Sequence, residues 1–223
     1  MNGKRTYHDA CGIARALDVV GDRWAILVIR ELLLGPKRFT DLRTGLPALG
    51  SDVLAQRLRD LEAAGVLRQR KLAPPAASKV YELTQAGAAL GPALAALGLW
   101  GGVHAPAPPA GVGMSVDSHI LHLTTLFEPE LARDFEFSLD LLMGEDAYSV
   151  EIANGSIDAG HGAALAADAD VRTNPSTFLA LVRGWRELPD ALAAGDIEIF
   201  GDEDAFARFL GLFPLPEPAA GAV

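Results

Sequence analysis

The chain has 223 residues, half of them hydrophobic, which is enough for one large domain or two ordinary domains with real cores. Residues 1–103 carry 14 Lys and Arg against 9 Asp and Glu, a net charge of +5, whereas the remainder carries 5 against 20, a net of −15. An acidic surface is repelled by phosphates, so only the first half suits a nucleic-acid partner. Solubility alone is an equally simple explanation for the acidity of the second half.

Several functional classes lack their sequence signals. No run reaches the roughly 18 consecutive apolar residues that a membrane span needs, and residues 1–5 lead into no apolar signal core. The single cysteine, Cys11, excludes an internal disulfide. No P-loop, Ser-His-Asp order or pair of catalytic carboxylates stands out. The sequence therefore predicts a cytoplasmic protein without enzymatic activity, cofactor or metal.

Two helices are predicted near the start of the chain. Residues 8–20 form the first, and its apolar side chains recur at spacings of four and three on one face: Ile13, Leu17 and Val20. This face is a candidate dimer contact. Residues 24–34 form the second helix, which ends at Gly35-Pro36 because proline cannot continue a helix.

A short amphipathic turn and a longer helix follow. Residues 39–43 form the turn, with Thr40 as its N-cap. The longer helix runs from Asp52 to Ala64, with Ser51 as N-cap and Gly65 as the closing residue. Its predicted apolar stripe consists of Val53, Leu54, Leu58 and Leu61. The opposite face carries polar groups that can reach base edges: Asp52, Gln56 and Arg59.

A basic β-hairpin is predicted after this helix. Residues 66–72 and 79–83 read as strands, and the proline-containing segment 73–78 is a loop because proline lacks an N–H for the ladder. Helix, turn, helix, strand, loop and strand is the order of a winged helix. Basic residues lie along the second helix and the hairpin: Arg57, Arg59, Arg68, Arg70, Lys71 and Lys79. Such a surface gains affinity by displacing counterions from phosphates.

Short stretches of this half carry a family resemblance: Cys11, Ala16–Trp24, Leu32–Phe39, Leu42-Arg43, Leu54–Leu58, Leu61–Gly65 and Tyr81–Gly87. Together they closely resemble the HxlR-type bacterial transcriptional regulators over roughly the first hundred residues. The resemblance implies a dimeric winged-helix repressor or activator whose first and last helices form the dimer contact. Asp52 departs from the family, where a basic residue is more usual, and this leaves base preference near it open.

The candidate DNA-binding residues follow from this arrangement: Arg38, Ser51, Gln56, Arg57, Arg59, Arg70, Lys71 and Lys79. Gln56 can pair bidentately with adenine and Arg59 with guanine, while a merely solvated helix face is the plainer alternative. Arg57 lies nearer the helix flank, where it can instead pair with an acid. The three basic residues of the hairpin are expected to touch phosphate or sugar, because a wing follows the backbone or the minor groove.

The predicted fold class is α+β, in two domains. Residues 1–103 form the winged-helix DNA-binding and dimerisation domain, which is mostly helical with a two-stranded wing. Its last helix opens at Thr84, and Pro92 is a candidate kink. Residues 104–113 form a Pro/Ala/Gly linker. Residues 114–214 form an α+β domain with a mixed or antiparallel sheet covered by helices, and 215–223 form a flexible tail.

The second half changes from helical to alternating patterns. Residues 118–127 are ambiguous between helix and strand, and Asn154-Gly155 is a type I′ hairpin signal. Strands are predicted at 134–141, 147–152, 156–159, 169–173 and 196–201. Asn174 caps a helix with Pro175 at its first position, and its apolar side is predicted to carry Phe178, Leu181, Val182 and Trp185. Two further helices are predicted at 188–194 and after 202–204.

Four stretches of this half carry a second, weaker resemblance: Asp134–Leu141, Tyr148–Gly155, Asp168–Thr173 and Ala191–Asp202. They are similar to sterol-carrier-like (SCP2-like) domains. The resemblance implies a sheet with helices on one side around an apolar tunnel for fatty-acyl or sterol-like ligands, although some relatives use the domain only for association. The candidate ligand-binding residues are Phe135, Phe137, Leu139, Tyr148, Val150, Phe178, Trp185, Phe206 and Phe209. Plain core is the alternative for the phenylalanines and Trp185.

Two further features carry alternatives. Some relatives of the HxlR type sense oxidants or electrophiles through a cysteine at the position of Cys11, so this residue is a candidate redox sensor, with a small buried side chain as the plainer interpretation. His119 and His122 are three residues apart, but only Asp117 accompanies them at metal-ligand spacing, and no metal site is expected.

The sequence thus predicts a homodimeric, sequence-specific regulator that binds a pseudo-palindromic DNA operator and is modulated by a hydrophobic or lipid-like effector, without membrane contact. Three alternatives stay open. In the first, the carboxyl domain is only an oligomerisation module. In the second, regulation runs through Cys11 or is absent. In the third, the protein is a lipid carrier or enzyme whose winged helix serves a partner protein.

Overall fold

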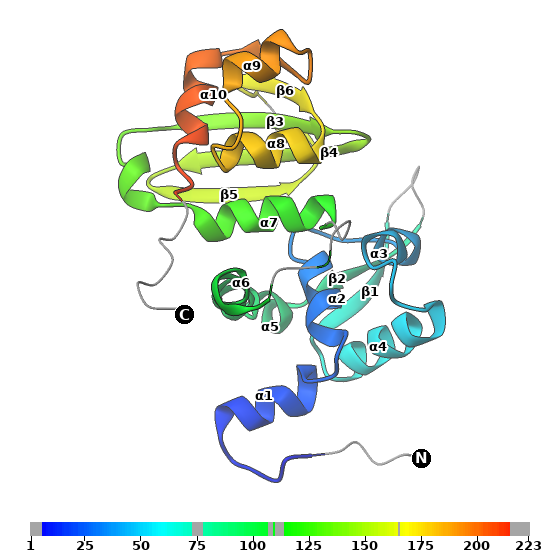
Figure 1. The fold of residues 1–223 in the computed structure, drawn as a ribbon. Helices are drawn as coiled ribbons and strands as arrows, with labels where there is room; N and C mark the ends of the chain where they lie inside the picture. Colours follow the sequence, from blue (N-terminus) through cyan, green and yellow to red (C-terminus); the bar gives the residue numbers. More distant parts are fainter. Residues whose placement is uncertain (1–5, 73–77, 107–108, 110–113, 165, 215–223) are drawn as a thin grey trace. The chain divides into compact units, whose positions relative to one another are not determined.

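The structure of the protein is a computed structural model (Figure 1), which describes residues 1–223 apart from 1–5, 73–77, 107–108, 110–113, 165 and 215–223. The chain divides into two compact units, Met1–Leu94 and Ala95–Val223. The predicted loop, much of the predicted linker and the predicted tail therefore lie outside the described residues. The predicted domain boundaries stay predictions.

The amino-terminal elements follow the predicted order: α1 (Gly12–Val20), α2 (Ala25–Glu31), α3 (Phe39–Gly45), α4 (Ser51–Ala63), β1 (Leu67–Lys71), β2 (Lys79–Leu83), α5 (Gln85–Ala88) and α6 (Gly91–His104). Helix α1 begins four residues later than predicted. His8 has a φ of +51°, which no right-handed helix allows, and the backbone N–H of Cys11 donates to Asp9 Oδ1 at 2.8 Å. These two features hold the chain in a turn until Gly12.

The predicted caps of α3 and α4 are wrong by one or two residues. Helix α3 is preceded by Arg38, whose N–H donates to Asp41 Oδ2 at 2.9 Å, so Thr40 lies inside the helix. Helix α4 starts at Ser51 with Gly50 as its N-cap, and Ser51 makes no side-chain cap. Val53, predicted in the apolar stripe, is 44% exposed. Successive residues on a helix are rotated by about 100°, so the side chain of Val53 lies away from the buried face that contains Leu54.

The turn after α4 and the hairpin agree with the prediction. Gly65 has a φ of +73°, and the N–H of Val66 returns to Leu61 O at 2.9 Å, which is a glycine C-cap. Strands β1 and β2 pair antiparallel from Leu67↔Leu83 to Lys71↔Lys79. Thr84 caps α5 by accepting from the Gly87 N–H at 3.2 Å. The predicted single helix is interrupted between α5 and α6, just before Pro92, which has no N–H to continue the ladder.

The carboxyl-terminal unit is built around one five-stranded sheet. Its elements are α7 (Val116–Leu126), a 3₁₀ turn (Pro129–Ala132), β3 (Phe137–Met143), β4 (Asp146–Ala153), β5 (Ser156–His161), β6 (Ala169–Thr173), α8 (Pro175–Val182), α9 (Leu188–Ala193), β7 (Ile197–Gly201) and α10 (Glu203–Leu210). The strand order is β5-β4-β3-β6-β7, with β3 and β6 parallel and the other pairs antiparallel. Figure 1 shows α7, α8 and α10 against one face of this sheet. The mixed sheet with helices confirms the α+β fold class.

Alternation along the strands decides which side chains meet those helices. In β3 and β4 every second residue is buried: Phe137, Leu139, Leu141, Met143, Tyr148, Val150 and Ile152. The ambiguous segment 118–127 is a helix, since Ile120 and Leu123 fall on one buried face. Asn154 and Gly155 have φ values of +52° and +69°, as a type I′ turn requires. Asn174 Oδ1 accepts from the Thr177 N–H at 2.9 Å, so the predicted cap of α8 is confirmed.

Candidate DNA-reading surface

Helix α4 is held in one rotation by its apolar side. Leu54, Leu58 and Leu61 are at most 1% exposed and belong to the core of the first unit. Each buried leucine contributes about 1.5–3 kcal/mol relative to an exposed one, so rotating the helix would be costly. Gln56 and Arg59 are consequently fixed on the exposed face. The structure brings these two predicted readers together.

Hydrogen bonds join the polar side chains of this face. Arg59 Nη2 donates to Gln56 Oε1 at 2.7 Å, and Gln56 Nε2 donates to Asp60 Oδ1 at 2.8 Å. The spacings are three and four residues, which place side chains next to each other on a helix. The sequence interpretation missed Asp60, although its position four residues after Gln56 is the signal that finds it.

Arg57 does not join the exposed face. Its side chain is 19% exposed and its Nη1 forms ion pairs with Asp22 Oδ2 and, at 3.3 Å, with Asp60 Oδ2. Asp22 comes from the turn that follows α1. Of the two interpretations of Arg57 made from the sequence, pairing with an acid is the one that the single chain adopts.

Two other predicted contacts lie at element starts. Arg38, exposed in front of α3, donates from Nε to Ser78 Oγ at 3.1 Å, which ties α3 to the beginning of β2. Ser51 is exposed in the first turn of α4, where its hydroxyl is not used as a cap. Backbone N–H groups and hydroxyls at a helix N-terminus are suitable phosphate donors.

The hairpin carries a carboxylate between two arginines. Glu82 Oε1 accepts from Arg68 Nε and Glu82 Oε2 from Arg70 Nε, both at 2.7 Å. Burial raises the pKa of Glu82, but the hydrogen bonds from the two arginines outweigh it and hold that pKa below its usual value. Both arginines remain largely exposed, at 66% and 48%, so they can still face a phosphate.

Lys71 and Lys79 lie directly opposite each other at the open end of the hairpin. Both are exposed, and among the described residues neither has an acidic partner. Like charges directly opposite each other across two strands are destabilising, and an anion placed between them relieves the repulsion. This end of the hairpin therefore favours a phosphate group.

Comparisons with known proteins agree with this geometry. The HxlR-like helix-turn-helix family model matches residues 19–108. The regulator YvaP of Bacillus subtilis is 35% identical over 86 residues, which is 39% of this chain and 80% of that protein. The regulator YkvN of Bacillus subtilis is 38% identical over 97 residues, 43% of this chain and 81% of that protein. The chain belongs to the HxlR-like helix-turn-helix family. Both relatives are described as HTH-type transcriptional regulators.

Among solved structures, the oxidised redox regulator HypR matches 44% of this HxlR-like chain and 100% of its own, with 28% identity and a TM-score of 0.41. Cys11 in the present chain is an exposed free cysteine at the N-cap of α1. A buried apolar role is therefore not what the single chain shows, and redox sensing at Cys11 stays a prediction.

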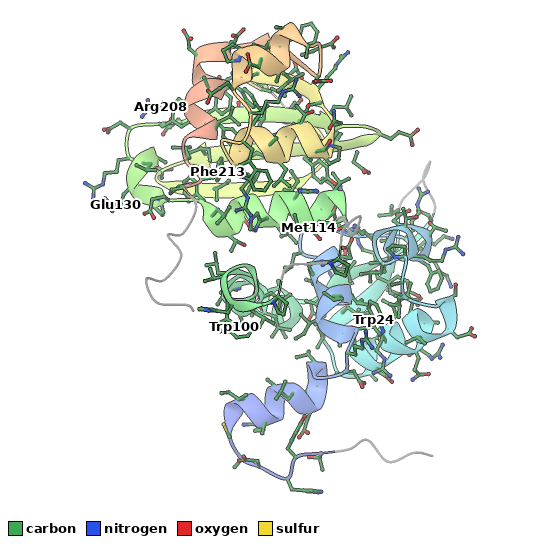
Figure 2. All side chains as sticks on the ribbon, viewed as in Figure 1. Trp24, Trp100, Met114, Glu130, Arg208 and Phe213 are labelled. Atoms are coloured by element: carbon green, nitrogen blue, oxygen red, sulfur yellow. The ribbon has the colours of Figure 1, made fainter. Side chains whose placement is uncertain are left out.

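Helix α1 and helix α6, which spans the boundary between the two compact units, expose apolar side chains. On α1 these are Ile13, Leu17 and Val19, and on α6 they are Leu97, Leu99, Trp100 and Val103. Trp100 is 59% exposed on the surface of α6 (Figure 2). The stretch Gln85–His104 has a mean hydropathy of 1.4 with 6% of it buried, so by length and composition it also meets the minimum for a membrane span. An exposed association helix meets that minimum equally well.

Most predicted ligand residues of the second unit are closely packed. Phe135, Phe137, Leu139, Tyr148, Val150, Phe178, Phe206 and Phe209 are all at most 7% exposed. Their rings pack on one another, with centroid distances of 5.5 Å for Phe135–Phe137, 5.7 Å for Phe137–Phe209 and 5.9 Å for Phe206–Phe209. Such distances are those of packed aromatic pairs in a core.

Trp185 is the exception. Its side chain is 70% exposed, so the prediction that it lies on the apolar side of α8 is wrong. Helix α8 ends at Val182, and Gly184 has a φ of +63°, which turns the chain out of the helix before residue 185. The ring instead lies 5.9 Å from the Arg183 guanidinium.

A cleft of about 620 Å³ lies beside this turn, between α8, the start of α9 and α10. Its apolar walls include Leu181, Val182, Leu188, Leu210 and Phe213. Among the described residues, Phe213 is the one buried aromatic residue in the lining of this cleft. It was predicted on the final helix and was given no ligand role. The cleft has the volume of a small-molecule site.

Arg183 forms a polar edge of this cleft. Its Nη2 lies 2.5 Å from His122 Nε2, and its Nε is buried without a hydrogen-bond partner within the described part of the chain. Burial, followed by the charge of Arg183 and the neighbouring His119, lowers the pKa of His122 to about 4. His122 is therefore neutral at pH 7 and accepts from the guanidinium.

A second buried polar group connects α7 to the sheet. Asp117, only 4% exposed, accepts from the Tyr148 hydroxyl at 2.6 Å, and its Oδ2 lies 3.0 Å from His161 Nε2. The sequence interpretation assigned Tyr148 to a ligand site, whereas here it fixes the first turn of α7 on β4. Among the described residues no three metal-ligating side chains gather at one point.

The second unit has a family match of its own. The alkyl sulfatase C-terminal family model matches residues 113–219. The sequence predicted a sterol-carrier-like domain here, and this comparison finds a differently described family.

Proposed function

We propose that this chain is a sequence-specific DNA-binding transcriptional regulator that acts as a homodimer, in the cytoplasm and without enzymatic activity. The observation that carries the proposal is the exposed pair Gln56 and Arg59 on a rigidly packed helix, beside a hairpin with an unneutralised lysine pair at its end. A helix of this kind reads base edges in the major groove, while hairpin cations contact the backbone. Arg38, Ser51, Arg70, Lys71 and Lys79 are assigned to phosphate contacts.

Selection of bound sequences from genomic and random DNA tests the proposal. We expect enrichment of a pseudo-palindrome whose half-sites lie about 34–36 Å apart, and affinity that falls steeply with salt. Failure to retard either the enriched DNA or the promoter DNA of its own gene at low salt would contradict the proposal. That result would favour a lipid carrier or enzyme whose winged helix contacts a protein.

The homodimer is supported by the exposed apolar faces of α1 and α6. Family members are typically dimeric, and a second copy of the chain offers the same two faces. Small residues of α6, which include Gly98, Gly101 and Gly102, have open space beside them and allow close helix approach. Sedimentation velocity at micromolar concentration is expected to give a dimer, and a monomer would contradict it.

We further propose that a hydrophobic small molecule bound in the second unit modulates DNA binding. The tight packing of the predicted aromatic residues favours the cleft beside Leu188 and Leu210 as its site, rather than the sheet core. An SCP2-like, sterol-carrier-like role for this unit is part of the same proposal. Coupling of about 1–3 kcal/mol between the two sites would suffice to switch operator occupancy.

Native mass spectrometry of protein purified from its own cells tests this effector. We expect a bound small molecule that is lost on Ala207→Trp, which fills the cleft, and kept on the control Ala193→Trp, which lies on α9 outside the cleft lining. No bound molecule in the wild type would leave the second unit as an oligomerisation module.

The alternative regulator is Cys11. Its exposure at the N-cap of α1, on the helix proposed for dimer contact, favours an effect of thiol modification on subunit arrangement. If Cys11→Ser still releases DNA on treatment with an oxidant that releases the wild type, this alternative fails.

A further inference from the structure

A continuous chain of side-chain contacts crosses α4. It runs from Asp22 through Arg57, Asp60 and Gln56 to Arg59. Both carboxylate oxygens of Asp60 are engaged, since Oδ1 accepts from Gln56 and Oδ2 faces Arg57 at 3.3 Å. One carboxylate thus orients a residue on each side of it.

The chain occupies both ends of the Gln56 amide. Its Nε2 donates to Asp60 and its Oε1 accepts from Arg59. Bidentate recognition of adenine needs this same Nε2 as donor and this same Oε1 as acceptor. Each atom has one further site, a second lone pair on Oε1 and a second hydrogen on Nε2, so Gln56 can read adenine only by sharing both atoms with its present contacts or by giving those contacts up.

Arg59 keeps more of its hydrogen-bonding sites than Gln56 does. A guanidinium has five N–H donors, and the described contact to Gln56 uses one of its terminal nitrogens. Donors remain for a bidentate contact to guanine O6 and N7, while the bond to Gln56 reduces the freedom of a long side chain. The same contact that engages the Gln56 oxygen holds Arg59 in place.

From this geometry we infer a single base-reading residue on this face, Arg59, which contacts guanine, with Gln56 and Asp60 as its positioning residues. Arg57 holds Asp60 and does not contact phosphate. The inference rests on the proposed DNA-binding function and makes it specific, because it replaces two readers of two base pairs by one reader of one G·C pair.

Base preference at every operator position tests the inference. The variants are Arg59→Ala, Gln56→Ala, Asp60→Ala and Asp60→Asn, with Glu62→Gln as control. Glu62 is an exposed acid of the same helix outside the chain of contacts, and glutamine keeps an oxygen that accepts from the Gln69 N–H, so this variant reports the general effect of removing one negative charge. Thermal unfolding of each variant checks that the fold is retained.

We expect Arg59→Ala to lose about tenfold or more of the discrimination at one G·C pair per half-site. Gln56→Ala and Asp60→Ala should lose about threefold to tenfold of the discrimination at that same pair. Without these two residues Arg59 can still contact the guanine, but it adopts the required orientation less often. Asp60→Asn keeps an oxygen that accepts from Gln56 and should stay within about twofold of the control.

A different pattern would overturn the inference. If Gln56→Ala loses an A·T preference at a separate position, Gln56 is a reader, and if Asp60→Ala matches the control, Asp60 positions nothing. A wild-type protein that enriches no sequence overturns the proposed function itself, together with the inference. That outcome is visible before any variant is compared.

Discussion

Two regions of the molecule treat their apolar side chains in opposite ways. In the sheet domain Phe206 and Phe209 are fully buried, whereas helix α6, which spans the boundary between the two units, leaves Leu97 and Trp100 more than half exposed. Buried aromatic rings stabilise the unit that contains them. Exposed apolar residues along one helix are costly in water and indicate a partner. The contrast separates a region whose apolar side chains are packed from one whose exposed face supports the proposed dimer.

The largest expected effect tests the closed core. Phe209→Ala removes a ring that packs 4.9 Å from Phe213 and 5.7 Å from Phe137, and should cost about 3–5 kcal/mol of unfolding free energy. Urea denaturation followed by circular dichroism measures it. Phe200→Ala, at a 53% exposed position, is the control, and equal midpoints for the two variants would contradict a packed core.

The next effect tests the exposed helix. The double variant Leu97→Glu with Trp100→Glu should make the protein monomeric and weaken operator binding about 100-fold, because two linked half-site contacts become one. Analytical ultracentrifugation and gel retardation measure both effects. Leu131→Glu, an exposed apolar position of the second unit, should change neither.

A smaller effect separates reading from holding within the first unit. Lys79→Ala should weaken binding to all sequences alike and make the salt slope shallower by about 1, since one phosphate contact is lost. Arg59→Ala should instead relax sequence preference. Fluorescence anisotropy across a salt series decides between them, and equal loss of specificity in both variants would contradict the division.

The pH dependence tests the polar edge of the second unit. The pKa of His122 is lowered from 6.5 to about 4, so below pH 6.5 the unfolded chain binds a proton that the folded chain does not. Stability from this group is fully present above pH 6.5 and is lost as pH falls toward 4. Melting temperatures between pH 7.5 and 4.5 should therefore drop less steeply in His122→Asn than in the control His104→Asn.

The smallest effect concerns Trp185. Because its side chain is 70% exposed, Trp185→Ala should change the unfolding free energy by no more than about 0.5 kcal/mol. Urea denaturation alongside Phe178→Ala, where the ring is 1% exposed, measures the difference. Similar losses in the two variants would place Trp185 in a contact that the single chain does not have.

Local signals accounted for most of the fold. The hairpin turn at Asn154-Gly155 and the cap at Asn174 agree with the structure because their residues determine backbone geometry within a few positions. Predictions failed where a small error in the position of a residue on a helix, or in the end of a helix, changes the side to which its side chain points. Val53 was assigned to a face that belongs to Leu54, and Trp185 was placed on a helix that ends at Val182.

The candidate site divides in the same manner. Residue type and helical spacing were sufficient to nominate Gln56 and Arg59. They were not sufficient for Arg57, because its partner Asp22 is distant in sequence and only folding brings the turn after α1 beside α4. The cleft between α8, α9 and α10 had no sequence signal, since its walls come from separate elements whose apolar residues look like core.

The sequence by itself determined the order of elements, the family of the first unit and the types of side chain available for DNA, because periodicity, caps and turns are local properties. The tertiary structure decided which of those side chains are free. Long-range packing fixes the rotation of α4, pairs Arg57 with acids, fills the aromatic core of the second unit and leaves the cleft beside it. These outcomes depend on distances between residues far apart in the chain, which spacing along a sequence does not encode.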